Sequence, residues 1–87
     1  MNENELIRRT VLEYLALRPT AAYEVPQITR MINMHGMLDM KLQEHHTSEA
    51  LAFLLGMDYV SVQHGGLGSS KNWQVTSPGI LYHERGE

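Results

Sequence analysis

The segment that decides the fold is residues 47–63, which read TSEALAFLLGMDYVSVQ. Its first part repeats apolar residues every three or four positions, which is the period of the buried face of an α-helix. These residues are Ala50, Leu51, Leu54 and Leu55. After Gly56 the period changes to two over residues 59–63, as in a strand with one buried face. We therefore expect a helix that Thr47 caps and Gly56 ends, followed directly by a β-strand.

The residues after this strand predict a hairpin and a final helix. Residues 64–72, HGGLGSSKN, are rich in glycine and serine, and residues 73–76 alternate again. This pattern indicates an antiparallel partner strand that is joined to the first by a long glycine-rich tip. Ser77 and Pro78 then resemble an N-cap and a first-turn proline, which predicts a short helix through Tyr82.

The N-terminal half begins with a predicted helix over residues 3–17. Its apolar side chains fall on one face, and Asn2 or Asn4 is suited to cap its start. Pro19 cannot continue a helix, so we expect the helix to stop before it.

A second helix is predicted from Pro26 to the neighbourhood of Gly36. Proline suits the first turn of a helix, and glycine readily adopts the left-handed conformation that ends one. Residues 20–25 before this helix have the pattern of a brief strand. Residues 37–46 after it are expected to form a loop with a helical turn.

This order of elements resembles the winged helix-turn-helix superfamily. Residues 48–60 look like a recognition helix that ends in a glycine and runs into the first wing strand. Residues 73–79, WQVTSPG, are similar to the second wing strand and the Thr-x-x-Gly turn that follows it. The resemblance implies an α+β fold with three helices, a C-terminal β-hairpin wing and a short terminal helix. It covers residues 1–87 as a single winged-helix domain.

Composition narrows the class of protein further. The chain has 87 residues, which suits one domain, and it has no cysteine, which excludes disulfides and thiolate metal sites. The polar, acidic first residues do not have the pattern of a secretory signal. The longest apolar run, residues 50–55, is too short to span a bilayer. We expect a cytoplasmic protein with no membrane segment.

The resemblance implies that the third helix enters the major groove of duplex DNA and that the wing contacts the DNA backbone or the minor groove. Candidate contacts are the positions that the predicted core does not require. In and before the third helix they are Gln43, His45, His46, Thr47 and Ser48, with Glu49, Ala52 or Phe53 further along. In the wing they are Ser69, Ser70, Lys71 and Asn72. A flanking basic patch is expected from Arg8, Arg9 and Arg30.

The distribution of charge argues for weak rather than strong attraction to DNA. The net charge is −3, and residues 31–60 carry the whole excess of acid. The presumed recognition segment has Lys41 against Glu44 and Glu49, and it has no arginine for a bidentate contact with guanine. A homodimer would double this small basic footprint.

A protein-interaction module on the same scaffold is the alternative function. Methionine adapts to varied partners, and this chain repeats it every three residues. The repeat consists of Met31, Met34, Met37 and Met40. Exposure of Phe53 or Tyr82 would favour this alternative.

Catalysis and metal binding have little support in the sequence. The chain has five histidines, but His45 and His46 are adjacent and point in different directions, so they chelate poorly. Residues 65–68 are glycine-rich but lie between two predicted strands, which suits a wing tip rather than a phosphate-binding loop. We expect no enzymatic activity, no cofactor, no metal and no small-molecule substrate.

Overall fold

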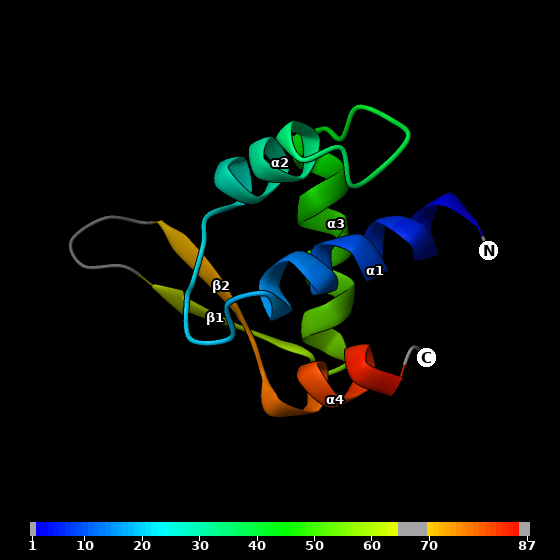
Figure 1. The fold of residues 1–87 in the computed structure, drawn as a ribbon. Helices are drawn as coiled ribbons and strands as arrows, with labels where there is room; N and C mark the ends of the chain where they lie inside the picture. The colour runs from blue at the N-terminus through cyan, green and yellow to red at the C-terminus, as the bar shows by residue number, and fades with distance from the viewer. Residues whose placement is uncertain (1, 65–69, 86–87) are drawn as a thin grey trace.

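The computed structural model describes residues 2–64 and 70–85, and Figure 1 shows its elements. This part of the chain has four helices and one antiparallel sheet of two strands, which places it in the α+β class. In chain order the elements are α1 (Glu3–Ala16), α2 (Val25–Met34), α3 (Glu44–Gly56), β1 (Val60–His64), β2 (Lys71–Val75) and α4 (Ser77–Arg85). Ser69 and the glycines of the predicted hairpin tip lie outside the described residues.

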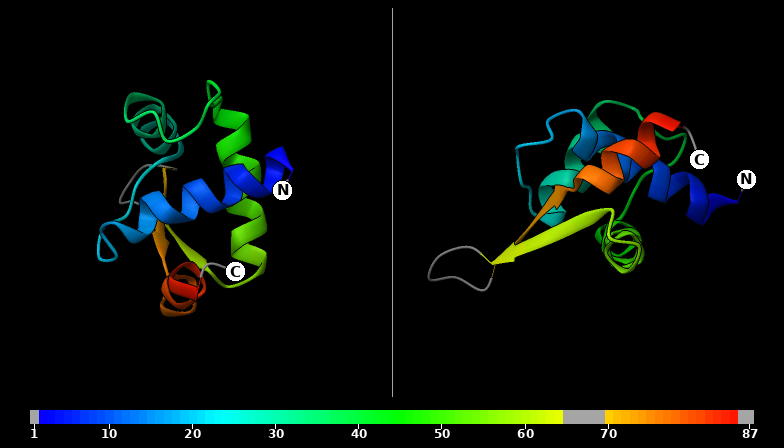
Figure 2. Two further views of the ribbon diagram at one scale, coloured as in Figure 1. Left: turned by 45° about the vertical axis from the view of Figure 1, so that its right-hand side comes forward. Right: turned by 90° about the horizontal axis from the view of Figure 1, so that it is seen from below.

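The helices enclose one core, and the hairpin projects from it (Figure 2). Helix α1 crosses α3 and also contacts α2 and α4, so it occupies the centre of the domain. The core takes side chains from α1, α2, α3 and both strands. Its buried apolar residues are Ile7, Val11, Leu12, Tyr14, Leu15, Ile28, Ile32, Leu42, Ala50, Leu51, Leu54, Val60, Trp73 and Val75.

The start and end of α1 agree with the sequence. Asn2 is the N-cap, and its Oδ1 accepts a hydrogen bond from the Glu5 N–H at 2.8 Å. The helix ends at Ala16, before Pro19. The brief strand expected next is reduced to one bridge, in which Tyr23 and Trp73 exchange two backbone hydrogen bonds of 3.0 and 2.8 Å.

Helix α2 has the predicted proline and glycine signals. Pro26 lies in its first turn, and Gly36, just beyond its C-terminus, has a φ angle of +62°. Residues 37–43 form turns and extended chain rather than a further helix.

The predicted start of α3 was wrong, because the N-cap is Gln43 and not Thr47. The helix begins four residues earlier than expected, at Glu44. Thr47 therefore lies inside the first turns, and its side chain is fully buried. The sequence before Thr47 hid this start, since glutamine is not a preferred N-cap residue.

The end of α3 also differs in one detail. Gly56 is its last residue, but the left-handed conformation falls on Asp58, whose φ angle is 63°. The Tyr59 N–H donates to the Leu54 carbonyl at 2.9 Å, and the Asp58 N–H donates to the Leu55 carbonyl at 3.0 Å. This pair of bonds is a Schellman motif, which aspartate can occupy at a small conformational cost.

The hairpin has the expected antiparallel pairing. Val60 pairs with Val75 and Val62 pairs with Trp73, so the buried side chains of the two strands share one face. Strand β1 begins one residue later than predicted, and β2 begins two residues earlier.

Helix α4 is capped by Thr76, not by Ser77 as predicted. The Thr76 Oγ1 accepts a hydrogen bond from the Gly79 N–H at 3.1 Å and donates one to the Asp58 carbonyl at 2.6 Å. Gly79 lies so close to β1 that an added Cβ would overlap the Tyr59 carbonyl oxygen. The Thr-x-x-Gly turn thus fastens α4 to the connection between α3 and β1. The helix then continues past Tyr82 to Arg85.

We expect Gly79→Ala to lower the free energy of unfolding by about 1–3 kcal/mol, because the methyl group forces α4 away from Tyr59. Gly56→Ala is the matched control, since nothing lies within 4 Å of a Cβ there. The control is expected to leave the free energy of unfolding unchanged or to raise it by up to about 1 kcal/mol, because alanine favours the helix more than glycine does. Urea unfolding of both variants tests this, and equal effects would contradict the steric argument.

Candidate nucleic-acid interface

A buried pair of hydroxyls fixes α2 against α3. The Thr29 Oγ1 donates to the Val25 carbonyl at 2.9 Å and lies 2.6 Å from the Thr47 Oγ1. A hydroxyl has a single proton, so Thr47 must be the donor to Thr29. This role explains why Thr47 is buried, and its hydroxyl is not available to a ligand.

The loop between α2 and α3 is held by the Asn33 side chain. Its Nδ2 donates to the Leu42 carbonyl at 2.9 Å, and its Oδ1 accepts from the Leu42 N–H at 2.8 Å. The amide therefore pairs with the backbone as a neighbouring strand would. Together with the Thr29–Thr47 pair it forms a polar clasp that sets the relative position of the two helices.

The clasp predicts a non-additive mutant cycle. Thr29→Val alone should cost about 1–3 kcal/mol of unfolding free energy, because it leaves the buried Thr47 hydroxyl without a partner. In the double variant Thr29→Val/Thr47→Val both hydroxyls are replaced by methyl groups of similar shape, so the loss should be smaller than the sum of the single losses. Denaturant unfolding of the four proteins measures the coupling, and strict additivity would refute it.

The outward face of α3 is the side opposite to its buried residues. Thr47, Ala50, Leu51 and Leu54 point into the core. The prediction that Leu55 belongs to the buried face was wrong, because its side chain is 38% exposed. Gln43 is exposed at the N-cap, and the exposed residues of the helix are Glu44, His45, Ser48, Glu49, Ala52, Phe53, Leu55 and Gly56. Most of the predicted helix contacts therefore reach the surface, whereas the proposed contact by Thr47 was wrong.

A hollow of about 440 Å³ separates this face from the hairpin. We call it the hairpin hollow; its walls come from the N-terminus of α2, the middle of α3 and strand β2. The lining residues are Glu24, Val25, Pro26, Ser48, Ala52, Lys71 and Trp73. The structure thus brings two predicted site residues, Ser48 and Lys71, to one place.

Two other properties of the described residues bear on the kind of site. Within residues 2–64 and 70–85, no three histidine, aspartate or glutamate side chains are grouped as metal ligands. No helix in the same ranges is long and apolar enough to cross a membrane.

No protein-family model matches the sequence, and no curated protein matches it. The structure is similar to that of a transcriptional regulator from Clostridium thermocellum, with a TM-score of 0.81 at 16% sequence identity. The match covers 99% of this chain and 84% of the other. This chain has the winged helix-turn-helix fold. Helix α3 is the third helix of this fold, and β1 and β2 form its wing hairpin.

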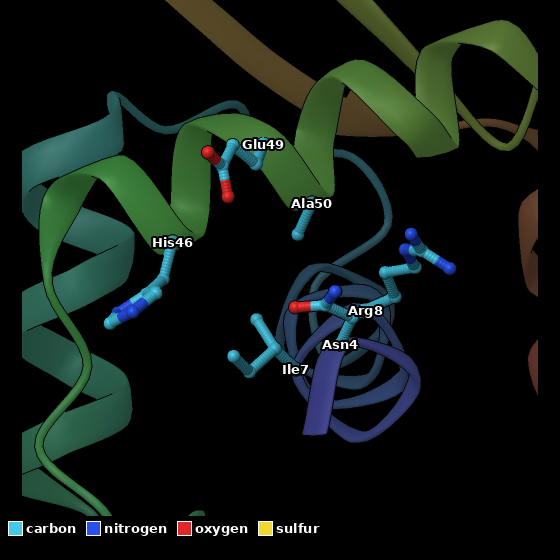
Figure 3. Close-up of a pocket in the computed structure, with 6 residues that line it drawn as sticks. All are labelled: Asn4, Ile7, Arg8, His46, Glu49 and Ala50. Carbon is cyan, nitrogen blue, oxygen red and sulfur yellow. The ribbon is translucent and has the colours of Figure 1, made fainter. Parts of the chain in front are cut away.

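The start of α3 is stabilised by His46. Its Nδ1 accepts a hydrogen bond from the Gln43 N–H at 3.0 Å, and its ring lies 4.0 Å from that of His45. The imidazole is half-buried, and its role in the structure is to cap α3. It also lines a narrow pocket between α3 and α1 (Figure 3).

We expect His46→Ala to lower the unfolding free energy by about 0.5–1 kcal/mol, because the Gln43 N–H loses its partner. His46→Gln is the matched control, since its amide oxygen can accept the same hydrogen bond. In thermal and urea unfolding, the stability of His46→Gln should be close to that of the wild type. A control as unstable as the alanine variant would argue against the capping role.

The three predicted arginines occupy different settings. The Arg8 guanidinium lies 3.7 Å above the centre of the Phe53 ring and so borders α3. Arg9 follows it in α1 and points roughly 100° away. Arg30 is exposed on α2. A common basic patch stays a prediction, in which Arg8 is the member best placed beside α3.

The predicted contacts in the described part of the wing differ in exposure. Lys71 and Ser70 are exposed, Asn72 is half-buried, and Ser69 lies outside the described residues. Trp73 is buried and anchors the wing to the core, and its Nε1 has no hydrogen-bond partner among the described residues.

Sequence reasoning missed the N-terminus of α2 as part of the site. Its first residues face the hairpin hollow beside Ser48 and Lys71. The available signal was Pro26, which marks a helix start, and such starts present backbone N–H groups to anions. Sequence spacing alone did not place that start beside the wing.

Proposed function

We propose that this chain is a transcriptional regulator of the winged-helix type that binds duplex DNA through α3 and the wing. The observation that carries the proposal is the hairpin hollow, where the exposed face of α3, the N-terminus of α2 and Lys71 converge. The similarity of the fold to a transcriptional regulator over 99% of the chain supports it. In this proposal the protein acts in the cytoplasm, needs no cofactor and catalyses no reaction.

Each part of the surface has a chemical role in this proposal. Lys71 and the positive end of the α2 dipole attract a phosphate to the hairpin hollow. His45, Ser48 and Gln43 present donors and acceptors to base edges, and Ala52 contacts a thymine methyl group. The wing residues Ser70 and Asn72 add backbone contacts.

The acidic residues on this face limit its affinity for DNA. Glu49 and Glu24 lie close to the surface that DNA would approach, and Lys71 is the basic residue in the hairpin hollow. We expect about two or three phosphates to be neutralised per protomer. The logarithm of the association constant should then fall with that of salt concentration with a slope of roughly −2 to −3.

The first test is fluorescence anisotropy with a labelled random-sequence duplex between about 25 and 200 mM salt, where counterion release is measurable. Trp73 is the sole tryptophan and lines the hairpin hollow, so its emission provides an independent signal of binding at that place. Saturable binding with the expected slope supports the proposal. No binding at the lowest salt concentration argues against it.

Lys71→Glu should weaken binding to all duplexes about tenfold or more and make the salt slope less negative by about one, because it removes one phosphate contact. Arg85→Glu makes the same change of charge on α4, away from the wing (Figure 1), and is the matched control. Ser48→Ala should instead change the preference among sequences. If Lys71→Glu and Arg85→Glu weaken binding equally, the effect is one of net charge and the assigned face is wrong.

A protein-binding adaptor is the second candidate function, and the exposure of Phe53 favours it. This ring is 45% exposed on the outward face of α3, next to Ala52 and under Arg8. The methionine repeat supports it less. Met31, Met37 and Met40 pack against the core, whereas Met34 is 66% exposed. A partner that binds the wild type but not a folded Phe53→Ser variant, in a protein without DNA affinity, would establish this function.

A further inference from the structure

A second hollow lies between the C-terminal end of α1 and the side of α2, and it shares no residue with the hairpin hollow. Its volume is about 270 Å³. We call it the tyrosine hollow, after the two rings in its wall. The residues that matter for its chemistry are Tyr14, Arg18, Tyr23, Gln27, Met31 and His35.

Two tyrosines that contact each other line this hollow. Their ring centres lie 5.3 Å apart at an angle of 50°, and Tyr14 is only 8% exposed. No hydrogen bond to another described residue engages the Tyr14 hydroxyl. That hydroxyl is not among the fully buried unpaired atoms of the described residues, so solvent reaches it, and Tyr14 is one of the residues that line the hollow. A nine-tenths buried tyrosine whose polar end is unpaired and accessible is a group that a ligand can use.

The tyrosine hollow carries the positive charge of the Arg18 guanidinium in its wall. Arg18 and His35 line it, and no carboxylate does. Burial raises the pKa of the Tyr14 phenol, the neighbouring Tyr23 adds to the rise, and Arg18 and Arg30 oppose it. Tyr14 therefore keeps its proton at neutral pH and can donate a hydrogen bond.

We propose that the tyrosine hollow binds a small aromatic carboxylate. The carboxylate group accepts hydrogen bonds from Arg18 and the Tyr14 hydroxyl, with the Gln27 amide at its edge. The aromatic ring packs against Tyr23 and the Met31 thioether, which favour such contacts. A cavity of about 150 Å³ can hold benzene, so the hollow has room for one ring with its acidic group. This proposal does not depend on DNA binding.

The test uses benzoate as the probe, added to about 20 mM to the ¹⁵N-labelled protein, a range suited to a ligand of this size. We expect saturable shifts of backbone amides near Tyr14, Tyr23 and Met31. Acetate, which lacks the ring, and benzyl alcohol, which lacks the charge, should bind at least about tenfold more weakly. Equal binding of all three compounds, or shifts confined to other surfaces, would overturn the proposal.

Variants separate recognition from loss of structure. Arg18 is exposed, so Arg18→Gln should keep the amide spectrum of the free protein and weaken benzoate binding at least about tenfold. Tyr14→Phe keeps the ring and should weaken binding about threefold to tenfold, since it removes one donor. Arg85→Gln is the control and should bind like the wild type. Unchanged binding by Arg18→Gln would reject the site.

Discussion

The polar clasp between α2 and α3 is the constraint on which the other surfaces depend. Apolar contacts alone are non-directional and leave two helices free to slide, whereas buried hydrogen bonds are satisfied in one arrangement only. Thr29 and Thr47 fix the helices where they cross, and Asn33 fixes the loop at Leu42. The N-terminus of α2 therefore stays beside Ser48, and the hairpin hollow exists.

Much of the fold could be predicted, because its elements differ in period and are separated by strong local signals. The change of period at Gly56, the glycine-rich tip and Pro26 each act over a few residues, and the structure confirmed the elements they predicted. The residues that cap the helices were harder to predict. Thr47, Gly56 and Ser77 have the right chemistry for caps, but Gln43, Asp58 and Thr76 take those positions. Thr47 is buried by its contact with the distant Thr29, and Thr76 is held by the distant Asp58 carbonyl, whereas the cap at Asp58 forms within the end of α3 itself.

The candidate site was predictable to a similar degree. Periodicity places Ser48 on the outward face of α3, and the hairpin pattern places Lys71 in the wing, so both were found. His46 and Thr47 have the same polar character, yet one caps its helix and the other joins a buried hydroxyl pair. The tyrosine hollow combines residues of α1, α2 and the segment between them. No sequence motif joins these residues, so the tyrosine hollow is recognised only in the folded chain.

The bridge between Tyr23 and Trp73 gives the two hollows a shared part. The Tyr23 ring lines the tyrosine hollow, its backbone pairs with Trp73, and Trp73 lines the hairpin hollow. The same two backbone hydrogen bonds therefore join the walls of two separate hollows on opposite sides of the Tyr23–Trp73 bridge. Any coupling between occupants of the two hollows would be reciprocal, each changing the affinity for the other by the same factor.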